Sequence, residues 1–303
     1  MAYRRTLKEA VGCTGIGLHS GKPVRLELKP ALAGSGIRFR RVDRDVEIPA
    51  TIGELQRLDH ATTLGRESTA IETVEHLLSA LFALGVDDAV IELDGPEVPA
   101  LDGSAAPFVI LIHEAGTKPQ RAAREYLKVL RPVEVVRGGK WARLLPSDHF
   151  RVTYTIGFDH PLLRHQHASF RLSPETFAEE IAPARTFGFL RDVETLRRSG
   201  LALGGSLENA IVIGETGVLN HKLRFENEFV RHKILDAIGD LALLGRPLVG
   251  HLEACKAGHA LHAALVQKLL AAEDAWALVP HPAAPVLDVP RASSRPALVP
   301  EPL

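Results

Sequence analysis

The chain has 303 residues, 46% of them hydrophobic, and a formal net charge of −1. A nearly neutral chain has no overall field to attract nucleic acid or an anionic membrane surface. No apolar run approaches the ~18 residues needed to cross a bilayer, and the charged N-terminus is not followed by the apolar segment of a signal peptide. Because Cys13 and Cys255 do not indicate a secreted disulfide framework, we expect a cytoplasmic protein of two domains or one large one.

The first half of the chain predicts a small β-sheet with two helices. Residues 1–50 alternate apolar and polar side chains between glycines, as in VRLELKP and GIRFRRV, which is typical of strands joined in hairpins. An apolar stripe of helical spacing follows at 71–84. After it come a predicted strand, AVIELDG, a turn-rich loop and a second predicted helix, PFVILIHEAG.

The helix predicted at 71–84 carries Glu75 and His76 inside its apolar stripe. A capped helix with a hydrogen-bonded histidine accounts for this pair without any function. Alternatively, His76 is a metal ligand and Glu75 is a free carboxylate beside it. This segment alone does not decide between the two interpretations.

The second half repeats the order of elements seen in the first. Residues 115–125 are polar and lack apolar periodicity, so we place a domain boundary there. Strands are predicted in YLKVLRPVEVV, KWARLLP and RVTYTIGF, and helices in SPETFAEEIA, with Ser173 as its N-cap, and in GHALHAALVQKLLAAEDAW. We expect an α+β fold of two similar domains, 1–120 and 126–279, followed by a proline-rich extension without packed structure, 280–303.

The most informative segment is EFVRHKILDAIGD, Glu228 to Asp240. Its apolar residues recur at helical spacing, yet Glu228, His232, Asp236 and Asp240 follow one another at four-residue intervals. Like charges at this spacing destabilise a helix by roughly a few tenths of a kcal/mol. A divalent cation held by His232 and Asp236 would offset that cost, although a charged, solvated helix face also accounts for the same residues.

Together the two helices offer His76, His232 and Asp236 as metal ligands. Two imidazoles and one carboxylate leave a fourth position for water, as in catalytic zinc sites. A general base for that water must lie beside it, and Glu75 is the neighbour of His76 in the chain. The sequence therefore predicts a metal-dependent hydrolytic site, and it contains no protease HExxH, P-loop or Rossmann motif.

Six motifs resemble, in order, those of the zinc-dependent UDP-3-O-acyl-N-acetylglucosamine deacetylases of lipid A synthesis. They extend from near the N-terminus to about residue 270. The motifs are GIGLHSG at 15–21, TVEHLLSAL at 73–81, PALDGSAAPFV at 99–109, ARTFGF at 184–189, NEFVRHKILDAIGDLALLG at 227–245 and KAGHALHAALV at 256–266.

The resemblance implies a fold of two α+β domains that face each other, with the active site between their helices. It implies His76, His232 and Asp236 as ligands of one catalytic Zn²⁺ and Glu75 as the general base. The implied substrate is a UDP-sugar that carries an acyl chain, with no nucleic acid and no integral membrane segment, and we expect a monomer.

The resemblance also implies roles for residues around the metal. His259 would be a cationic group near the leaving amine, Asp240 would orient it, and Thr186 would donate a hydrogen bond to the developing oxyanion. Contacts with the substrate are implied for Lys233, near phosphate, and for Phe187 and His19.

A groove for the acyl chain is expected in residues 189–214, where a short amphipathic helix would run from about Asp192 to Ser199. Leu203 is the candidate apolar contact, and packing of a small satellite core is the alternative for this leucine.

Two other functions remain open from the residues alone. A metal-dependent amide hydrolase of another N-acyl sugar would need the same metal site. A non-catalytic protein that binds a sugar nucleotide or an acyl chain is the second, and the complete ligand set with Glu75 argues against it, since a binder needs no activated water.

Overall fold

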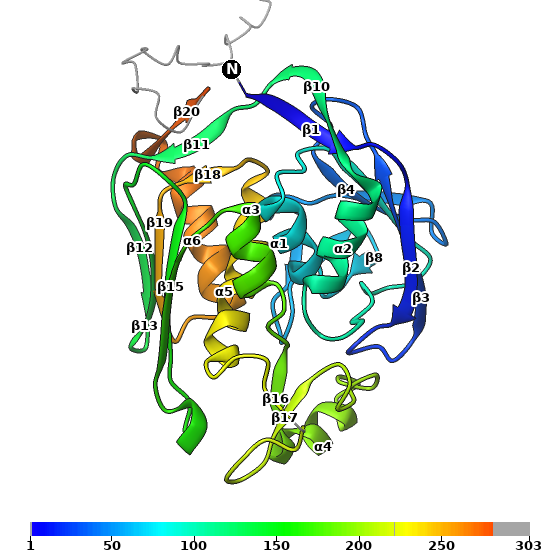
Figure 1. The fold of residues 1–303 in the computed structure, drawn as a ribbon, viewed down its shortest axis with the longest axis vertical. Helices are drawn as coiled ribbons and strands as arrows, with labels where there is room; N and C mark the ends of the chain where they lie inside the picture. The colour runs from blue at the N-terminus through cyan, green and yellow to red at the C-terminus, as the bar shows by residue number, and fades with distance from the viewer. Residues whose placement is uncertain (1, 221, 281–303) are drawn as a thin grey trace, which may run out of the picture.

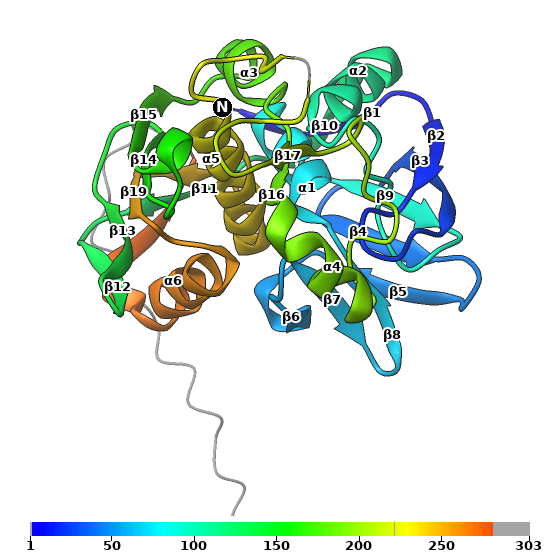
Figure 2. The same ribbon diagram turned by 90° about the horizontal axis from the view of Figure 1, so that it is seen from below.

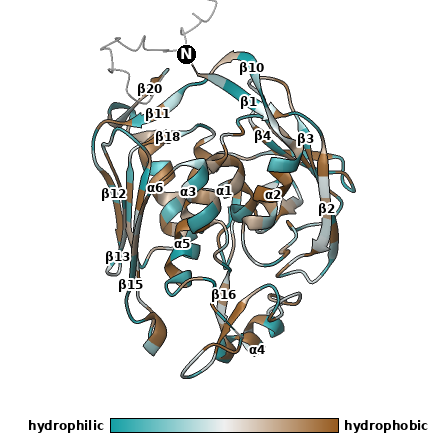
Figure 3. Ribbon diagram, viewed as in Figure 1, coloured by the Kyte–Doolittle hydropathy of each residue, from teal (hydrophilic) through white to brown (hydrophobic). Residues whose placement is uncertain are grey.

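The structure is a computed structural model that describes residues 2–220 and 222–280. Two five-stranded sheets form its outer layers, and the helices lie between them, except α4 (Leu190–Arg198), which lies with β16 (Phe187–Phe189) and β17 (Ile211–Ile213) at one end (Figure 1). Hydrophobic and hydrophilic residues alternate along the strands of both sheets, as Figure 3 shows, because only one face of each sheet covers the helices. The mixed α+β class predicted from the sequence is confirmed.

The two large sheets have the same topology. The first contains, in spatial order, β2 (Val11–Ile16), β3 (Pro23–Pro30), β9 (Ala89–Leu93), β4 (Ile37–Arg41) and β5 (Val46–Pro49). The second contains β12 (Val133–Arg137), β13 (Lys140–Leu145), β19 (His251–Cys255), β14 (Arg151–Ile156) and β15 (Gln166–Arg171). In the first sheet, β9 lies between β3, to which it is antiparallel, and β4, to which it is parallel. In the second sheet, β19 lies in the same way between β13, antiparallel, and β14, parallel. The two halves, for which the sequence predicts a similar order of elements, therefore also share a sheet topology.

Four smaller sheets complete the strands. They are β1 (Tyr3–Leu7) with β10 (Thr117–Ala123); β18 (Leu248–Val249), β11 (Tyr126–Val129) and β20 (Trp276–Val279); β6 (Leu55–Arg57), β7 (Thr63–Arg66) and β8 (Thr69–Ile71); and β16 (Phe187–Phe189) with β17 (Ile211–Ile213). The polar segment at 115–125 thus contains a strand, since β10 pairs with β1. The domain boundary placed there stays a prediction.

The helices of the described residues are α1 (Glu75–Ala83), α2 (Ala106–Ala115), α3 (Pro174–Thr176), α4 (Leu190–Arg198), α5 (Glu228–Leu241) and α6 (His259–Ala271). Single turns occur at η1 (Ile52–Glu54), η2 (Pro161–Leu163), η3 (Phe177–Ile181), η4 (Ala242–Leu244) and η5 (Glu273–Ala275). None of these helices is both long and apolar enough to cross a bilayer. The predicted extension from 280 onward lies outside the described residues, apart from Pro280.

Helix α1 begins later than its apolar stripe predicts. Ile71 belongs to strand β8, and Thr73 has a φ of +60°, which a helix cannot accommodate. The helix therefore starts at Glu75. This late start places Glu75 and His76 in the first helical turn.

The central contact of the molecule is the packing of α1 against α5, side by side in Figure 2. Gly239 on α5 makes it possible, because a Cβ atom there would lie 2.0 Å from the backbone oxygen of Glu75. The backbone of α1 can approach α5 this closely only where a side chain is missing. The same approach brings the polar residues of both helices together.

Candidate active site

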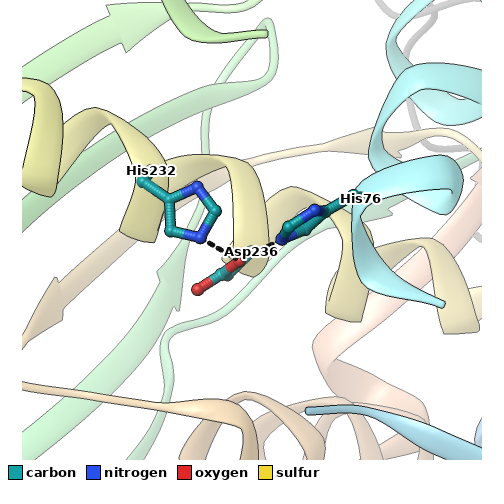
Figure 4. A group of neighbouring side chains, drawn as sticks. All are labelled: His76, His232 and Asp236. Carbon is teal, nitrogen blue, oxygen red and sulfur yellow. Dashed lines mark ion pairs between the residues drawn. The ribbon is translucent and has the colours of Figure 1, made fainter. Parts of the chain in front are cut away.

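His76, His232 and Asp236 form one buried group at the contact of α1 and α5. Nε2 of His232 lies 3.3 Å from Oδ1 of Asp236, and Nε2 of His76 lies 3.6 Å from the same oxygen. Figure 4 shows the carboxylate between the two rings, each of which turns a nitrogen toward it. The structure thus brings His76 together with the two other predicted ligands, which lie more than 150 residues further along the chain.

The group fits a tetrahedral metal ion. Two ligand atoms about 2.1 Å from a zinc ion lie about 3.4 Å from each other in tetrahedral geometry, close to the two separations from the Asp236 oxygen. Nitrogen and carboxylate oxygen are also donors that zinc accepts. The donor atoms are therefore arranged as a metal site requires.

Neighbouring groups leave one nitrogen of His232 available to bind a metal ion. Its Nδ1 lies 3.1 Å from the carbonyl oxygen of Ala184 and donates to it, so Nε2 keeps its lone pair. Burial lowers the pKa of His232 to about 4 despite the nearby Asp236. The imidazole is therefore neutral at physiological pH, the form that binds a metal.

Lys233 lies beside the same carboxylate, with Nζ 2.5 Å from Oδ2 of Asp236. Burial alone would raise the pKa of Asp236, but its neighbours His232 and Lys233 hold it well below its usual range. Asp236 thus remains ionised, with one oxygen toward the imidazoles and the other toward an ammonium group.

Glu75 is almost completely buried, and Oε2 accepts a hydrogen bond from the backbone N–H of Thr62 at 3.1 Å. Desolvation raises its pKa, although nearby histidines oppose that shift. A carboxylate with a raised pKa next to a metal site is suited to accept and return a proton near neutral pH.

Asp240, one turn further along α5, contacts His259 at the start of α6. Nδ1 of His259 lies 2.8 Å from Oδ2 of Asp240. Burial would lower the pKa of His259, but Asp240 outweighs burial and raises it to about 9. His259 therefore keeps its proton at neutral pH although it is buried.

Nδ1 of His262 also lies 2.8 Å from that oxygen. Asp240, His259 and His262 have donor atoms within 4.8 Å of one another. We interpret them as a hydrogen-bond network, because both nitrogens share one oxygen at hydrogen-bonding distance.

A buried carboxylate, Glu97, holds the segment that carries His19. Its two oxygens accept the backbone N–H groups of His19 at 2.9 Å and Ser20 at 2.7 Å. Oε1 also accepts the hydroxyl of Thr73 at 2.8 Å, immediately before α1. Glu97 therefore connects the His19 segment to the start of the helix that carries Glu75.

The other predicted residues lie on segments next to this cluster. Phe187 packs edge-on against Phe229, and its ring centroid is 6.2 Å from that of His232. Thr186 is half-buried, and its backbone N–H donates to Gly103 at 2.8 Å.

Leu203 is half-exposed, and its backbone N–H donates to the carbonyl of His19 at 3.1 Å. Ile211 and Ile213, which share its segment, are buried in the core. The helix of the segment spans Leu190–Arg198, two residues earlier than predicted at its start.

Three participants in the cluster were missed in the sequence. Thr62 donates to both Glu75 and Asp240, Tyr154 contacts His262, and Glu97 organises the His19 segment. Thr62 and Tyr154 lie in ordinary strand-like patterns that carry no signal of their own. Glu97 in PEVPA does interrupt an apolar segment with an acid, which could have marked it as a buried carboxylate.

Replacing Gly239 with alanine is expected to lower both kcat and metal affinity. Because the new methyl group meets the backbone of Glu75, α1 must move away from α5, and the ligands on the two helices separate. A displacement of about 1 Å at a catalytic group costs roughly 100-fold in rate. Gly53→Ala is the matched control, since a Cβ there meets only one atom, at 3.9 Å. Unchanged metal content and kcat in Gly239→Ala would contradict this account.

Comparison with known proteins identifies close relatives. A family model described as UDP-3-O-acyl N-acetylglycosamine deacetylase matches residues 4–271. The chain is 55% identical over 269 residues to a UDP-3-O-acyl-N-acetylglucosamine deacetylase of Anaeromyxobacter sp. (strain Fw109-5), with 88% of each chain covered. It is 52% identical over 284 residues to the protein of the same name from Pseudomonas entomophila, covering 92% of this chain and 94% of the relative. For the protein of that name from Syntrophotalea carbinolica, identity is 49% over 282 residues, covering 92% and 91%.

Proposed function

The chain belongs to the UDP-3-O-acyl N-acetylglycosamine deacetylase family, and from that premise we propose that it hydrolyses the N-acetyl group of UDP-3-O-acyl-N-acetylglucosamine. The products are UDP-3-O-acyl-glucosamine and acetate, in the committed step of lipid A synthesis. The observation that carries the proposal is the buried group of His76, His232 and Asp236 with Glu75 beside it. An amide hydrolase needs both a metal site and a base next to it.

One Zn²⁺ per chain, held by His76, His232 and Asp236, is the proposed cofactor. When bound, such an ion polarises a carbonyl group and lowers the pKa of water toward neutrality. Two observations support this ligand set. Nδ1 of His232 donates to the carbonyl of Ala184, so Nε2 has a free lone pair, and Asp236 is ionised.

Glu75 is the proposed general base. Its carboxylate takes a proton from the attacking water, and the hydrogen bond from Thr62 keeps Oε2 in place during that transfer. Thr186 is proposed to donate a hydrogen bond from its hydroxyl to the oxyanion that develops on the carbonyl oxygen of the substrate. The raised pKa of Glu75 supports its role as a base that accepts the proton of the attacking water near neutral pH.

His259 is proposed to stabilise or protonate the leaving amine. Its charge depends on Asp240, which accepts the Nδ1 hydrogen and leaves the other ring nitrogen for the substrate. The amine must leave in protonated form, so a histidine that is cationic at neutral pH suits this position.

Substrate contacts are proposed for Lys233, Phe187, His19 and Leu203. Lys233 already contacts Asp236, so we propose that its ammonium group bridges that carboxylate and a phosphate of the substrate. We further propose that the enzyme works as a cytoplasmic monomer. Its proposed partner is a UDP-sugar that carries an acyl chain.

Mass spectrometry of the reaction mixture tests the proposed activity. The purified chain is incubated with UDP-3-O-acyl-N-acetylglucosamine, and loss of the acetyl group is followed with and without a chelator. Substrates that lack the nucleotide or the 3-O-acyl chain run beside it. Equal turnover of plain N-acetylglucosamine would indicate a different N-acyl sugar hydrolase, and absence of acetate release would leave only a binding protein.

We expect kcat/KM to follow a bell-shaped curve in pH. The rate rises as Glu75 loses its proton, and this limb lies above the ordinary pKa of a glutamate because burial raises it. The rate falls at high pH as His259 loses its proton, at a pKa of about 9. Initial rates from pH 5 to 10 measure both limbs. A profile that is flat across this range would contradict the two assignments.

Leu203→Asp is expected to impair turnover of a long-acyl substrate selectively. Each CH₂ group buried against an apolar contact contributes about 0.8 kcal/mol, whereas a half-exposed side chain adds little to folding. We expect kcat/KM to fall at least about tenfold for the long-acyl substrate and little for one without that chain. Leu32→Asp, at an exposed loop position, is the control. Equal losses for both substrates would place Leu203 outside the acyl contact.

A further inference from the structure

The carboxylate of Asp240 is shared by three buried donors. Its Oδ1 atom lies 2.5 Å from the hydroxyl of Thr62. Its Oδ2 atom lies 2.8 Å from Nδ1 of His259 and also 2.8 Å from Nδ1 of His262. The deacetylation steps described above use the ring of His259 and the backbone N–H of Thr62. His262 is fully buried and has no task in them.

The second ring nitrogen of His262 faces Tyr154, whose hydroxyl oxygen lies 2.9 Å from Nε2. The Asp240 carboxylate can only accept, so Nδ1 of His262 carries the ring hydrogen and donates it. In the neutral ring Nε2 is then an acceptor, and the hydroxyl of Tyr154, which is fully buried and keeps its hydrogen because desolvation raises its pKa, donates to it. The donors thus run in one direction, from Tyr154 to His262 and on to Asp240.

The two imidazoles on α6 differ in charge although they share one carboxylate oxygen. Burial lowers the pKa of His262, which is therefore a neutral donor. Asp240 overcomes burial at His259 and raises its pKa. The other titratable or charged groups that act on His259 are Glu75, Asp236, Lys233, His262 and His19. Environments that shift the pKa values of two neighbouring titratable groups in opposite directions are typical of sites that move protons.

We propose that His262 is a positioning residue for His259, which it affects through Asp240, and that Tyr154 holds His262 in the tautomer that donates to this carboxylate. The hydrogen bond from His262 fixes the orientation of the carboxylate and uses part of its basicity. His259 therefore releases its proton at a lower pH than it would with Asp240 to itself. The inference deepens the proposed deacetylation and rests on it only for the effect on rate.

Substituting His262 tests the coupling in the zinc-loaded enzyme. His262→Leu removes the donor and keeps a side chain of similar size. In His262→Asn the amide nitrogen takes the place of Nδ1 and can still donate to Asp240. Titration of ¹⁵N-labelled histidines by NMR gives the pKa of His259 in each protein without any turnover. The pH dependence of kcat is measured in parallel.

In His262→Leu we expect the pKa of His259 to rise by about half to one pH unit, the effect of one lost hydrogen bond to its carboxylate partner. The basic limb of kcat should move by the same amount. His262→Asn should return both values toward those of the parent enzyme. If His262→Leu instead lowers kcat by one factor at every pH while the His259 titration is unchanged, His262 only fills space and the proposal is wrong.

Tyr154→Phe removes a single oxygen atom and keeps the test decisive if His262→Leu does not fold. Without the hydroxyl of Tyr154, no hydrogen bond to Nε2 of His262 favours the tautomer in which Nε2 is the acceptor. We expect the ¹⁵N shifts of His262 to leave the pure Nδ1–H tautomer and the pKa of His259 to rise. An unaltered tautomer together with an unaltered His259 titration would overturn the proposal. An enzyme that shows the NMR shifts but releases no acetate would refute the proposed function and leave the coupling intact.

Discussion

Replacing His232 with alanine is expected to remove nearly all bound zinc and nearly all deacetylation. His232 supplies one of three donors, and its Nε2 lies 3.3 Å from the carboxylate oxygen that completes the group. Loss of a residue that merely orients a ligand already costs 10- to 100-fold in metal affinity, so loss of a ligand itself should cost more. Elemental analysis of the dialysed protein gives zinc per chain, and initial rates give the activity.

His76→Ala should behave in the same way, although His76 lies on the other helix. His113→Ala is the matched control, because His113 is exposed on α2 and contributes to no candidate metal group among the described residues. Both ligand variants keeping one zinc ion per chain would refute the ligand assignment. Addition of excess zinc should restore part of the metal content but not the rate, since the geometry of the site is lost.

Glu75→Gln is expected to keep zinc and lose about 100-fold or more in kcat, the usual contribution of a positioned general base. The amide oxygen of glutamine can still accept the N–H of Thr62, so the helix start should be preserved. An amide cannot take up the proton of the attacking water. Zinc content, melting temperature and kcat are measured on the same preparation.

Glu114→Gln, at an exposed position on α2, is the control for the loss of one negative charge. It should leave kcat within a factor of two of the parent. If Glu75→Gln has a near-normal kcat with full zinc, another group must accept the proton, and Glu75 has no part in the chemistry.

Much of the architecture follows from periodicity. The alternating segments of the first 50 residues form β2 to β5, and the apolar stripe with His232 and Asp236 forms α5. Ser173 caps the following turn by accepting the N–H of Thr176. These predictions are confirmed because burial on one face fixes the pattern of side chains directly. The two five-stranded sheets share one spatial order of strands. From the sequence only a similar order of elements along the chain could be predicted, since pairing between strands far apart in the chain leaves little trace in a single sequence.

The start of α1 and the contacts of Thr62, Tyr154 and Glu97 with the site residues could not be predicted. Thr73 has a φ of +60°, and its hydroxyl donates to Glu97, which lies 24 residues away. Thr62 reaches Asp240 across 178 residues. Local propensity carries no information on such contacts. The strand within 115–125 was missed for the same reason, since it forms by pairing with β1, more than 100 residues earlier in the chain.

The division of the proposed ligands between α1 and α5 has a consequence for stability. Glu75 and His76 come from the half that builds the first sheet, and His232 and Asp236 come from the half that builds the second. A metal ion held by both helices is therefore a cross-link between the halves, and the free energy of binding it is available only when they are docked. At a free metal concentration 100 times the dissociation constant, this linkage adds about 2.7 kcal/mol to the docked state. The ion that serves catalysis would thus also hold the two halves together, and scarcity of metal would lower the stability of the docked state as well as the rate of the reaction.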